Sequence, residues 1–149
     1  MKKTIQKMRR VLANVVRQYR PDPRNLRCYD PEEGQCVYNM SVPHGQVKGG
    51  MTHCAVGMHM TPEIRDQGED WTGNGESLWD LAYPNCYRDG IDEDNNPSVA
   101  LDSLLEPDYR GLPFLFWSRL QEFHDDPCHW QSRGALKEKA GLIKQEFAL

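Results

Sequence analysis

Apolar residues recur every three or four positions through the first twenty residues, which is the spacing of one face of an α-helix. The residues of this stripe are Ile5, Met8, Leu12, Val15, Val16 and Tyr19. Thr4 is a suitable N-cap, and Pro21 interrupts the pattern, because proline lacks the backbone N–H that an inner helical turn needs. The pattern therefore predicts an amphipathic helix over residues 4–19.

The spacing changes to alternation between Cys36 and Val42, where Tyr38 and Met40 share a face with these two residues. A period of two is typical of a half-buried strand. The turn-rich segment Asp30–Gly34 precedes this stretch and predicts a reversal of the chain. We therefore expect residues 36–42 to form the second strand of a β-hairpin.

Four shorter helical segments are predicted after the hairpin. They cover residues 52–58, 97–105 and 113–126, and a last stretch from His129 or Ser132 to Gly141. Pro127 is expected to stop the third of these helices and Gly141 the fourth. The expected fold is α+β, a small antiparallel sheet or hairpin covered by about four or five helices, with a long acidic loop insertion.

The chain of 149 residues has the size of one domain, so we expect a single domain over residues 1–149. Its longest apolar stretch, residues 112–117, is six residues long, against about 20 for a membrane-spanning helix. The basic start lacks the pattern of a secretory signal. Five cysteines are an odd number and fit free thiols in a reducing compartment. We expect a cytoplasmic protein that does not enter the membrane.

Charge is unevenly distributed along the chain. Residues 1–20 contain seven basic residues and no acidic one, although the whole chain has a net charge of −4. A helix of this kind can contact nucleic acid or an acidic partner, but it can also be solvated or lie against the acidic part of its own chain. A DNA-contacting accessory protein that uses residues 2–20 is one prediction, although not the favoured one.

Residues 66–97 form an acidic, loop-rich insertion. Nine acids and one base lie between Asp66 and Asp94, a density that repels a phosphate backbone and complements a basic protein surface. Tryptophans among these acids are suitable anchors for a protein interface, or they pin the loop to its own domain. The candidate partner-binding residues are Asp66, Glu69, Asp70, Trp71, Trp79, Asp89, Asp92, Glu93 and Asp94.

Cys54 is the candidate nucleophile of a competing prediction, a cysteine hydrolase or transferase. It follows Thr52 at a predicted helix start, where the helix dipole lowers the pKa of a thiol. His124 would move the proton, and Asp125 or Asp126 would orient the imidazole. Neighbouring side chains on a helix point about 100° apart, so structural or capping roles for these three residues are favoured.

Cysteine and histidine residues leave a structural zinc open as a minor alternative. Cys28 or Cys36 with His44, or Cys128 with His129, are the residues that could assemble it. None of these spacings is the paired spacing of a zinc finger. We therefore expect no metal and no cofactor.

Three sequence blocks resemble a small-protein family of bacteriophages and prophages. They are Cys36-Val37-Tyr38, Cys54-Ala55-Val56-Gly57 with Thr61-Pro62-Glu63, and Leu120-Gln121-Glu122-Phe123-His124-Asp125 with Trp130. Family members share an N-terminal helix, a Cys-x-Tyr strand, a Cys-Ala-Val/Ile-Gly helix start, and a Leu-Gln-x-x-His-Asp helix that leads to a Trp. Residues 70–95 look like an insertion into this pattern. The resemblance implies a phage or prophage origin and a fold, and not a reaction.

Binding is favoured over catalysis by these patterns together. We expect a small phage-type accessory protein that binds and modulates or inhibits a host protein, such as a defence or nucleic-acid-handling enzyme. Its acidic, aromatic-containing surface would imitate the charge of phosphate. If a phage encodes the chain, its compartment is the cytoplasm of the host cell.

Overall fold

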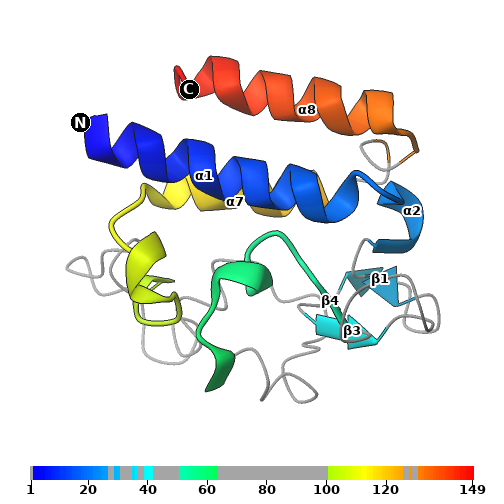
Figure 1. Ribbon diagram of the computed structural model, residues 1–149, viewed down its shortest axis with the longest axis horizontal. Helices are drawn as coiled ribbons and strands as arrows, with labels where there is room; N and C mark the ends of the chain where they lie inside the picture. The colour runs from blue at the N-terminus through cyan, green and yellow to red at the C-terminus, as the bar shows by residue number, and fades with distance from the viewer. Residues whose placement is uncertain are drawn as a thin grey trace, which may run out of the picture.

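Three helices dominate the described part of the chain. The structure is a computed structural model and describes residues 2–26, 29–30, 35–36, 39–41, 51–63, 101–125, 128 and 131–149. The helices are α1 (Lys2–Tyr19), α7 (Phe114–Asp125) and α8 (Arg133–Glu146). Helix α8 runs alongside α1 in the opposite direction, and both termini lie toward the same end of this helical layer (Figure 1).

The remaining described elements are short. They are the helix α2 (Pro23–Leu26), the 3₁₀ turns η1 (Gly57–His59) and η2 (Pro107–Tyr109), and the strands β1 (Tyr29–Asp30), β2 (Gln35–Cys36), β3 (Asn39–Ser41) and β4 (Met51–His53). The strands form two separate antiparallel pairs, β1 with β2 and β3 with β4. Tyr29 lies opposite Cys36, and Met40 lies opposite Thr52.

The expected α+β fold is wrong, because the described part is a helical structure. Its strands are only two or three residues long and form two-stranded ribbons at one end of the molecule (Figure 1). No sheet lies beneath the helices in this part of the chain. Alternation over seven residues fits such a ribbon as well as a sheet strand, so the pattern could not distinguish a helical core from a covered sheet.

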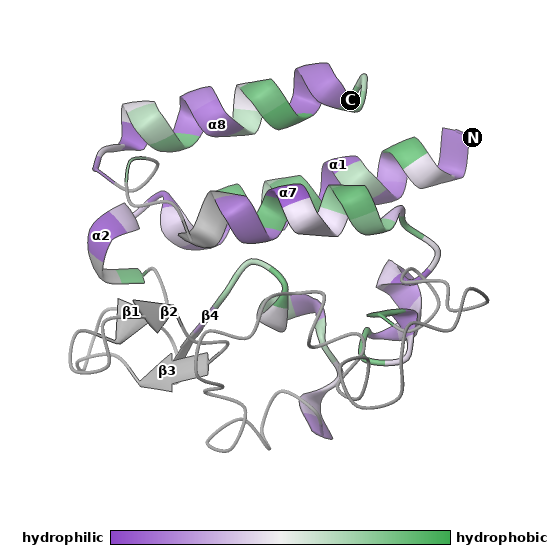
Figure 2. Ribbon diagram, turned by 180° about the vertical axis from the view of Figure 1, so that it is seen from behind, coloured by the Kyte–Doolittle hydropathy of each residue, from purple (hydrophilic) through white to green (hydrophobic). Residues whose placement is uncertain are grey.

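The core lies between the three helices and two connecting segments, residues 54–60 and 101–112. The helices bury Met8, Val11, Leu12, Val15, Tyr19, Phe116, Trp117, Leu120, Leu136, Ala140 and Ile143. The segments add Cys54, Ala55, Val56, Met60, Leu101, Leu105 and Leu112. Bands of hydrophobic and hydrophilic residues alternate along α7 and α8 (Figure 2). Burying each large apolar side chain contributes about 1.5–3 kcal/mol, so packing of the amphipathic faces holds the layer together.

Segments around η1 and η2 are tied to each other by backbone hydrogen bonds. The Thr61 N–H donates to the Leu104 carbonyl at 3.0 Å, and the Glu106 N–H donates to the His59 carbonyl at 3.0 Å. These bonds flank an antiparallel bridge between Met60 and Leu105. The two 3₁₀ turns therefore form one unit that packs against the helices.

Helix boundaries confirm some predictions and correct others. The first helix and the helix after Pro113 are present, and Ser132 is the N-cap of α8, its Oγ accepting from the Ala135 N–H at 3.1 Å. The predicted stop at Gly141 is wrong, because α8 continues to Glu146. Burial of Ile143 beyond the glycine offsets the roughly 1 kcal/mol by which glycine weakens a helix.

The helix predicted over residues 52–58 is also wrong. Met51–His53 is strand β4, and the helical turn is limited to Gly57–His59. Thr52 pairs with Met40 in the neighbouring strand. Its backbone is therefore extended and does not begin a helix.

Candidate functional site

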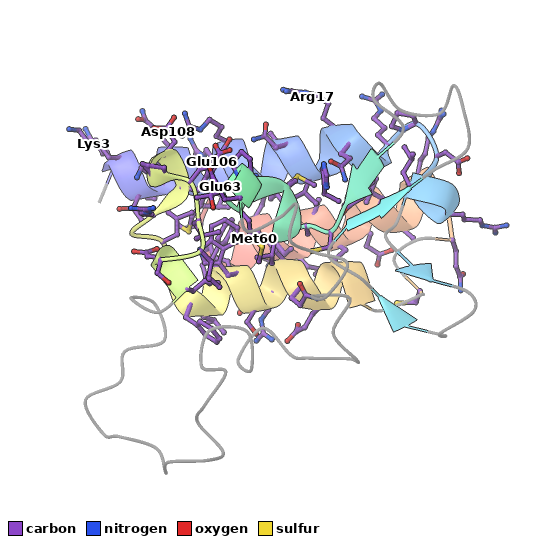
Figure 3. All side chains as sticks on the ribbon, turned by 90° about the horizontal axis from the view of Figure 1, so that it is seen from below. Lys3, Arg17, Met60, Glu63, Glu106 and Asp108 are labelled. Atoms are coloured by element: carbon purple, nitrogen blue, oxygen red, sulfur yellow. The ribbon has the colours of Figure 1, made fainter. Side chains whose placement is uncertain are left out.

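Helix α1 presents an exposed basic face opposite its buried face. Its buried residues include Met8, Leu12 and Val15, and the helix contains no acidic residue. The exposed side chains on the outer side are those of Lys2, Lys3, Arg9 and Arg17, with Arg20 just after the helix end. Lys3 and Arg17 point away from the body of the molecule (Figure 3).

One flank of α1 is docked on the chain's own η2 turn. Lys7 Nζ donates to the Arg110 carbonyl at 2.9 Å. Arg10 Nη2 donates to the Asp108 carbonyl at 3.2 Å and lies 3.6 Å from the Asp108 carboxylate, while its guanidinium stands 5.4 Å from the centroid of the Tyr109 ring. Lys7 and Arg10 therefore support the fold, as one interpretation of the basic helix expects.

Helix α8 adds a second row of basic residues beside α1. Arg133 donates through Nε to the Arg20 carbonyl at 2.9 Å and through Nη2 to the Pro21 carbonyl at 3.0 Å, so its flank of α8 faces α1. Lys137 and Lys144 follow at four and eleven residues, which places them on that same flank. Both lysines are exposed.

The opposite flank of α8 faces α7 and is charge-balanced. Arg119 Nε donates to the Glu146 carboxylate at 3.0 Å, and its Nη1 lies 2.7 Å from the Glu122 carboxylate. Lys139 Nζ lies 4.0 Å from Glu122. Glu138 is turned by about 100° from Lys137. The acidic side chains of α8 therefore do not pair with the cations of the row beside α1.

We define the basic surface by the cations exposed on the outer face of α1 and on the flank of α8 beside it. They are Lys2, Lys3, Arg9, Arg17, Arg20, Arg133, Lys137 and Lys144. None of these side chains forms an ion pair with another described residue. The three acids labelled in the view from below, Glu63, Glu106 and Asp108, lie near the first half of α1 (Figure 3). The basic surface thus carries eight exposed cations on two adjacent helices.

Sequence reasoning found the basic residues of α1 but missed those of α8. Arg133, Lys137 and Lys144 are spread over twelve residues that also include Glu138, so no dense run of charge marks them. Only the antiparallel packing of α8 on α1 brings them together. The sequence pattern around Cys54, in contrast, indicated a candidate nucleophile at a residue that is buried.

Cys54, the predicted nucleophile, is completely buried. Its Sγ accepts a hydrogen bond from the Gly57 N–H at 3.1 Å, and the residue belongs to the core. His124 and Asp125 lie in the last turn of α7. Their side chains lie outside the described part of the structure, and the assignment of these three residues to catalysis stays a prediction.

His59 is a buried ionisable residue that the sequence patterns did not single out. Its Nδ1 lies 3.0 Å from the Ala55 carbonyl, which can only accept, so Nδ1 carries the proton. The ring makes edge contacts with Tyr109 and Trp117, at centroid distances of 4.5 and 5.6 Å. Burial lowers the pKa of His59 to about 4, with a smaller lowering by the charge of Arg10. A neutral imidazole therefore forms part of the core.

The predicted partner-binding residues lie outside the described part of the chain. They are Asp66, Glu69, Asp70, Trp71, Trp79, Asp89, Asp92, Glu93 and Asp94. Within the described part, no three His, Cys, Asp or Glu side chains lie close enough together to hold a metal ion. No helix in the described ranges has the length and apolar character needed to cross a membrane.

Comparisons with known proteins leave the chain's relationships open. No family model matches it, and neither a curated protein nor a solved structure does. The resemblance to a phage family, which depends on short motifs, therefore stays a prediction. Function has to be argued from the residues of this chain.

Proposed function

We propose that this protein binds nucleic acid through the basic surface of α1 and α8. The observation that carries the proposal is the alignment of eight exposed cations on two adjacent helices, without an ion-pair partner among the described residues. Phosphate neutralised by Lys and Arg releases condensed counterions, which drives binding at low and moderate salt. A face of this kind suits a polyanion better than a small anion, because the cations are spread along two helices.

The dimensions of the surface support this proposal. Helix α1 has 18 residues and is therefore about 27 Å long at about 1.5 Å per residue. Duplex DNA carries one charge per about 1.7 Å of its axis, so a face of this length can reach several phosphates at once. Contacts of Lys and Arg to phosphates position a protein without reading the sequence.

Salt-dependent binding tests the proposal. Fluorescence anisotropy of a labelled 20-base-pair duplex is expected to give a Kd of about 1–100 µM at physiological salt, with a slope of log K against log salt of about −3 to −5. The variant Arg9→Gln/Arg17→Gln is expected to lower the magnitude of the slope by about 2, because each lost phosphate contact changes it by about 0.9.

A matched control removes two charges from the other flank of α8. Arg119→Gln/Lys139→Gln loses exposed ion pairs to Glu122 and Glu146, which contribute about 0–1 kcal/mol each. It should bind the duplex as the unmodified protein does. A duplex affinity that does not depend on Arg9 and Arg17, in protein of unchanged thermal stability, would contradict the proposal.

A second candidate function follows from the acid density of residues 66–94, where nine acids accompany one base. This density supports a phage-type accessory protein that binds and modulates or inhibits a host protein through Asp66, Glu69, Asp70, Asp89, Asp92, Glu93 and Asp94, with Trp71 and Trp79 as anchors. Charge reversal of these acids should abolish capture of a basic host protein in a pull-down. Capture that survives the reversal would exclude this second function.

A further inference from the structure

We infer that the nucleic acid bound by the basic surface is double-stranded and is held by its phosphates without regard to sequence. This inference rests on the proposed function and deepens it. It follows from three features of the surface: the absence of stacking side chains, the side-by-side packing of the two helices, and the two rows of cations that they expose.

No aromatic side chain is exposed on the described part of α1 or α8. Tyr19 is fully buried and donates to the His53 carbonyl at 2.6 Å, while Phe147, just after α8, packs edge-on against Phe116 at 5.3 Å. Single-strand binders stack successive bases on exposed aromatic rings, at about 1–3 kcal/mol per base in known cases. The basic surface offers cations and no such platform.

The packing of the helices does not suit readout of bases. A recognition helix has to project into the major groove so that its side chains reach the base edges. Helix α1 is covered by α8 along one flank and docked on η2 along the other through Lys7 and Arg10, so it exposes only its outer face. The cations on that face are of the type that contacts phosphates.

Two rows of cations favour a duplex over a single strand. Packed helices have axes about 8–10 Å apart, and the grooves of B-DNA are about 6 and 12 Å wide. One row, from α1, can therefore contact phosphates of one strand while the other, with Arg133, Lys137 and Lys144, contacts the second strand across a groove. A single strand presents one line of phosphates and leaves one row unused.

An anionic membrane surface fits this site less well. Amphipathic helices that lie in a membrane insert their apolar face, but the apolar face of α1 is in the core. Leu115 and Leu142 are the exposed large hydrophobic residues of the described part. Leu115 is on α7, and Leu142 is on α8 but is turned by about 140–160° from Lys137 and Lys144.

Anisotropy with the full chain tests the inference. The probes are two duplexes of 20 base pairs with unrelated sequences and the 20-nucleotide single strands from which they are made, at 50 and 200 mM salt. We expect the duplexes to bind at least about tenfold tighter than the single strands and within about threefold of each other. We expect Lys137→Gln/Lys144→Gln to weaken duplex binding about tenfold or more at 0.1 M salt, and Arg119→Gln/Lys139→Gln to leave it unchanged.

The outcomes separate this inference from the proposed function. Single strands that bind as tightly as duplexes, a strong preference for one duplex sequence, or no effect of Lys137→Gln/Lys144→Gln would overturn the inference and leave nucleic-acid binding through α1 in place. Failure to bind any of the nucleic acids at 50 mM salt would overturn both. Vesicles of anionic phospholipid complete the set, because binding to them that exceeds binding to the duplexes would also overturn both.

Discussion

His59 shows how a single side chain can make the stability of this molecule depend on pH. The imidazole is buried, hydrogen-bonded through Nδ1 to Ala55, and enclosed by the rings of Tyr109 and Trp117. Its Nε2 is also buried and has no hydrogen-bond partner among the described residues. Adding a proton there would place an uncompensated charge in the core, and the positive charge of Arg10 disfavours it further.

Acid is therefore expected to destabilise the fold through His59. The pKa is about 4 in the folded protein, against 6.5 for an ordinary histidine, so the unfolded chain binds more protons between these two values. The contribution of His59 is fully present above pH 6.5, falls as the pH drops toward about 4, and is constant below it. The loss amounts to about 3 kcal/mol, measurable by urea unfolding at pH 7.0, 5.5 and 4.5.

The variant His59→Phe isolates this effect from that of the other ionisable groups. It loses the hydrogen bond to Ala55 and is expected to be less stable at pH 7, but its stability should change less between pH 7.0 and 4.5 than that of the unmodified protein. Equal pH dependence in the two proteins would show that His59 is not the group responsible.

Cys54 and Cys128 are expected to differ sharply in reactivity. Cys54 is buried and Cys128 is exposed, and a thiol has to reach solvent to be alkylated. In the native protein at pH 8, iodoacetamide should modify Cys128 and leave Cys54 intact until urea unfolds the chain, as peptide mapping by mass spectrometry would show. Modification of Cys54 at the rate of Cys128 would favour the catalytic interpretation, and loss of that reactivity in His124→Ala would support it further.

At the scale of elements, α8 is important both to the fold and to the basic surface. Its N-terminus depends on Ser132, whose Oγ accepts from the Ala135 N–H at 3.1 Å, and on Arg133, which ties it to the end of α1. Its buried residues Leu136, Ala140 and Ile143 complete the core. Proper formation of its first turn therefore sets the position of the second row of cations.

Removal of this cap should cost about 1 kcal/mol. Ser132→Ala leaves the Ala135 N–H without its acceptor, and loss of an N-cap side chain lowers stability by about 0.5–2 kcal/mol. Ser132→Asp keeps an acceptor and favours the positive end of the helix dipole, so it should retain most of the stability. Thermal unfolding followed by circular dichroism compares the three proteins, and an aspartate variant no more stable than the alanine variant would contradict the capping role.

The elements that the sequence predicted correctly are those with a long, regular apolar period. Helix α1 combines five buried residues at helical spacing with an end signal at Pro21, so local pattern and final structure agree over most of its length. Its start was placed two residues too late, because α1 begins at Lys2 and Thr4 lies inside it. The alternating stretch does contain described strands, Gln35–Cys36 and Asn39–Ser41, but they belong to short two-stranded ribbons. The stop predicted at the lone Gly141 is wrong, because packing on either side decides such positions. The fold class failed for the same reason, since pairing between strands of two or three residues is not visible in the chain.

At the scale of the whole molecule, the candidate site could be predicted only in part. The part of the surface from α1 is visible in the sequence, because five of the seven cations in residues 1–20 belong to it. The half from α8 depends on which flank of that helix faces α1, and Arg133 reveals this only through its contacts with Arg20 and Pro21. Conversely, Lys7 and Arg10 look like binding residues in the sequence but support the fold.

The chain is basic in residues 1–20 and acidic in residues 66–94. These opposite charges should change the rate of association in opposite directions for the two proposed partners, a nucleic acid and a basic host protein. The net charge of −4 arises although residues 1–20 are strongly basic, so an approaching polyanion meets both an attractive surface and a repulsive overall field. Such a field acts over about 30 Å at 0.01 M salt but only about 10 Å at 0.1 M. Neutralising acids of residues 66–94, which belong to neither α1 nor α8, should therefore alter association mainly at low salt.

The variant Asp92→Asn/Glu93→Gln/Asp94→Asn tests this consequence. It raises the net charge by three, and we expect duplex DNA to bind it several-fold faster at 10 mM salt and at nearly the unmodified rate at 150 mM, as stopped-flow fluorescence would measure. The second proposed function predicts the opposite direction for a basic host protein, which the variant should bind more weakly. Slower association with the duplex at 10 mM salt would mean that these acids assist nucleic-acid binding, and the division of the molecule into one attractive and one repulsive part would then be wrong.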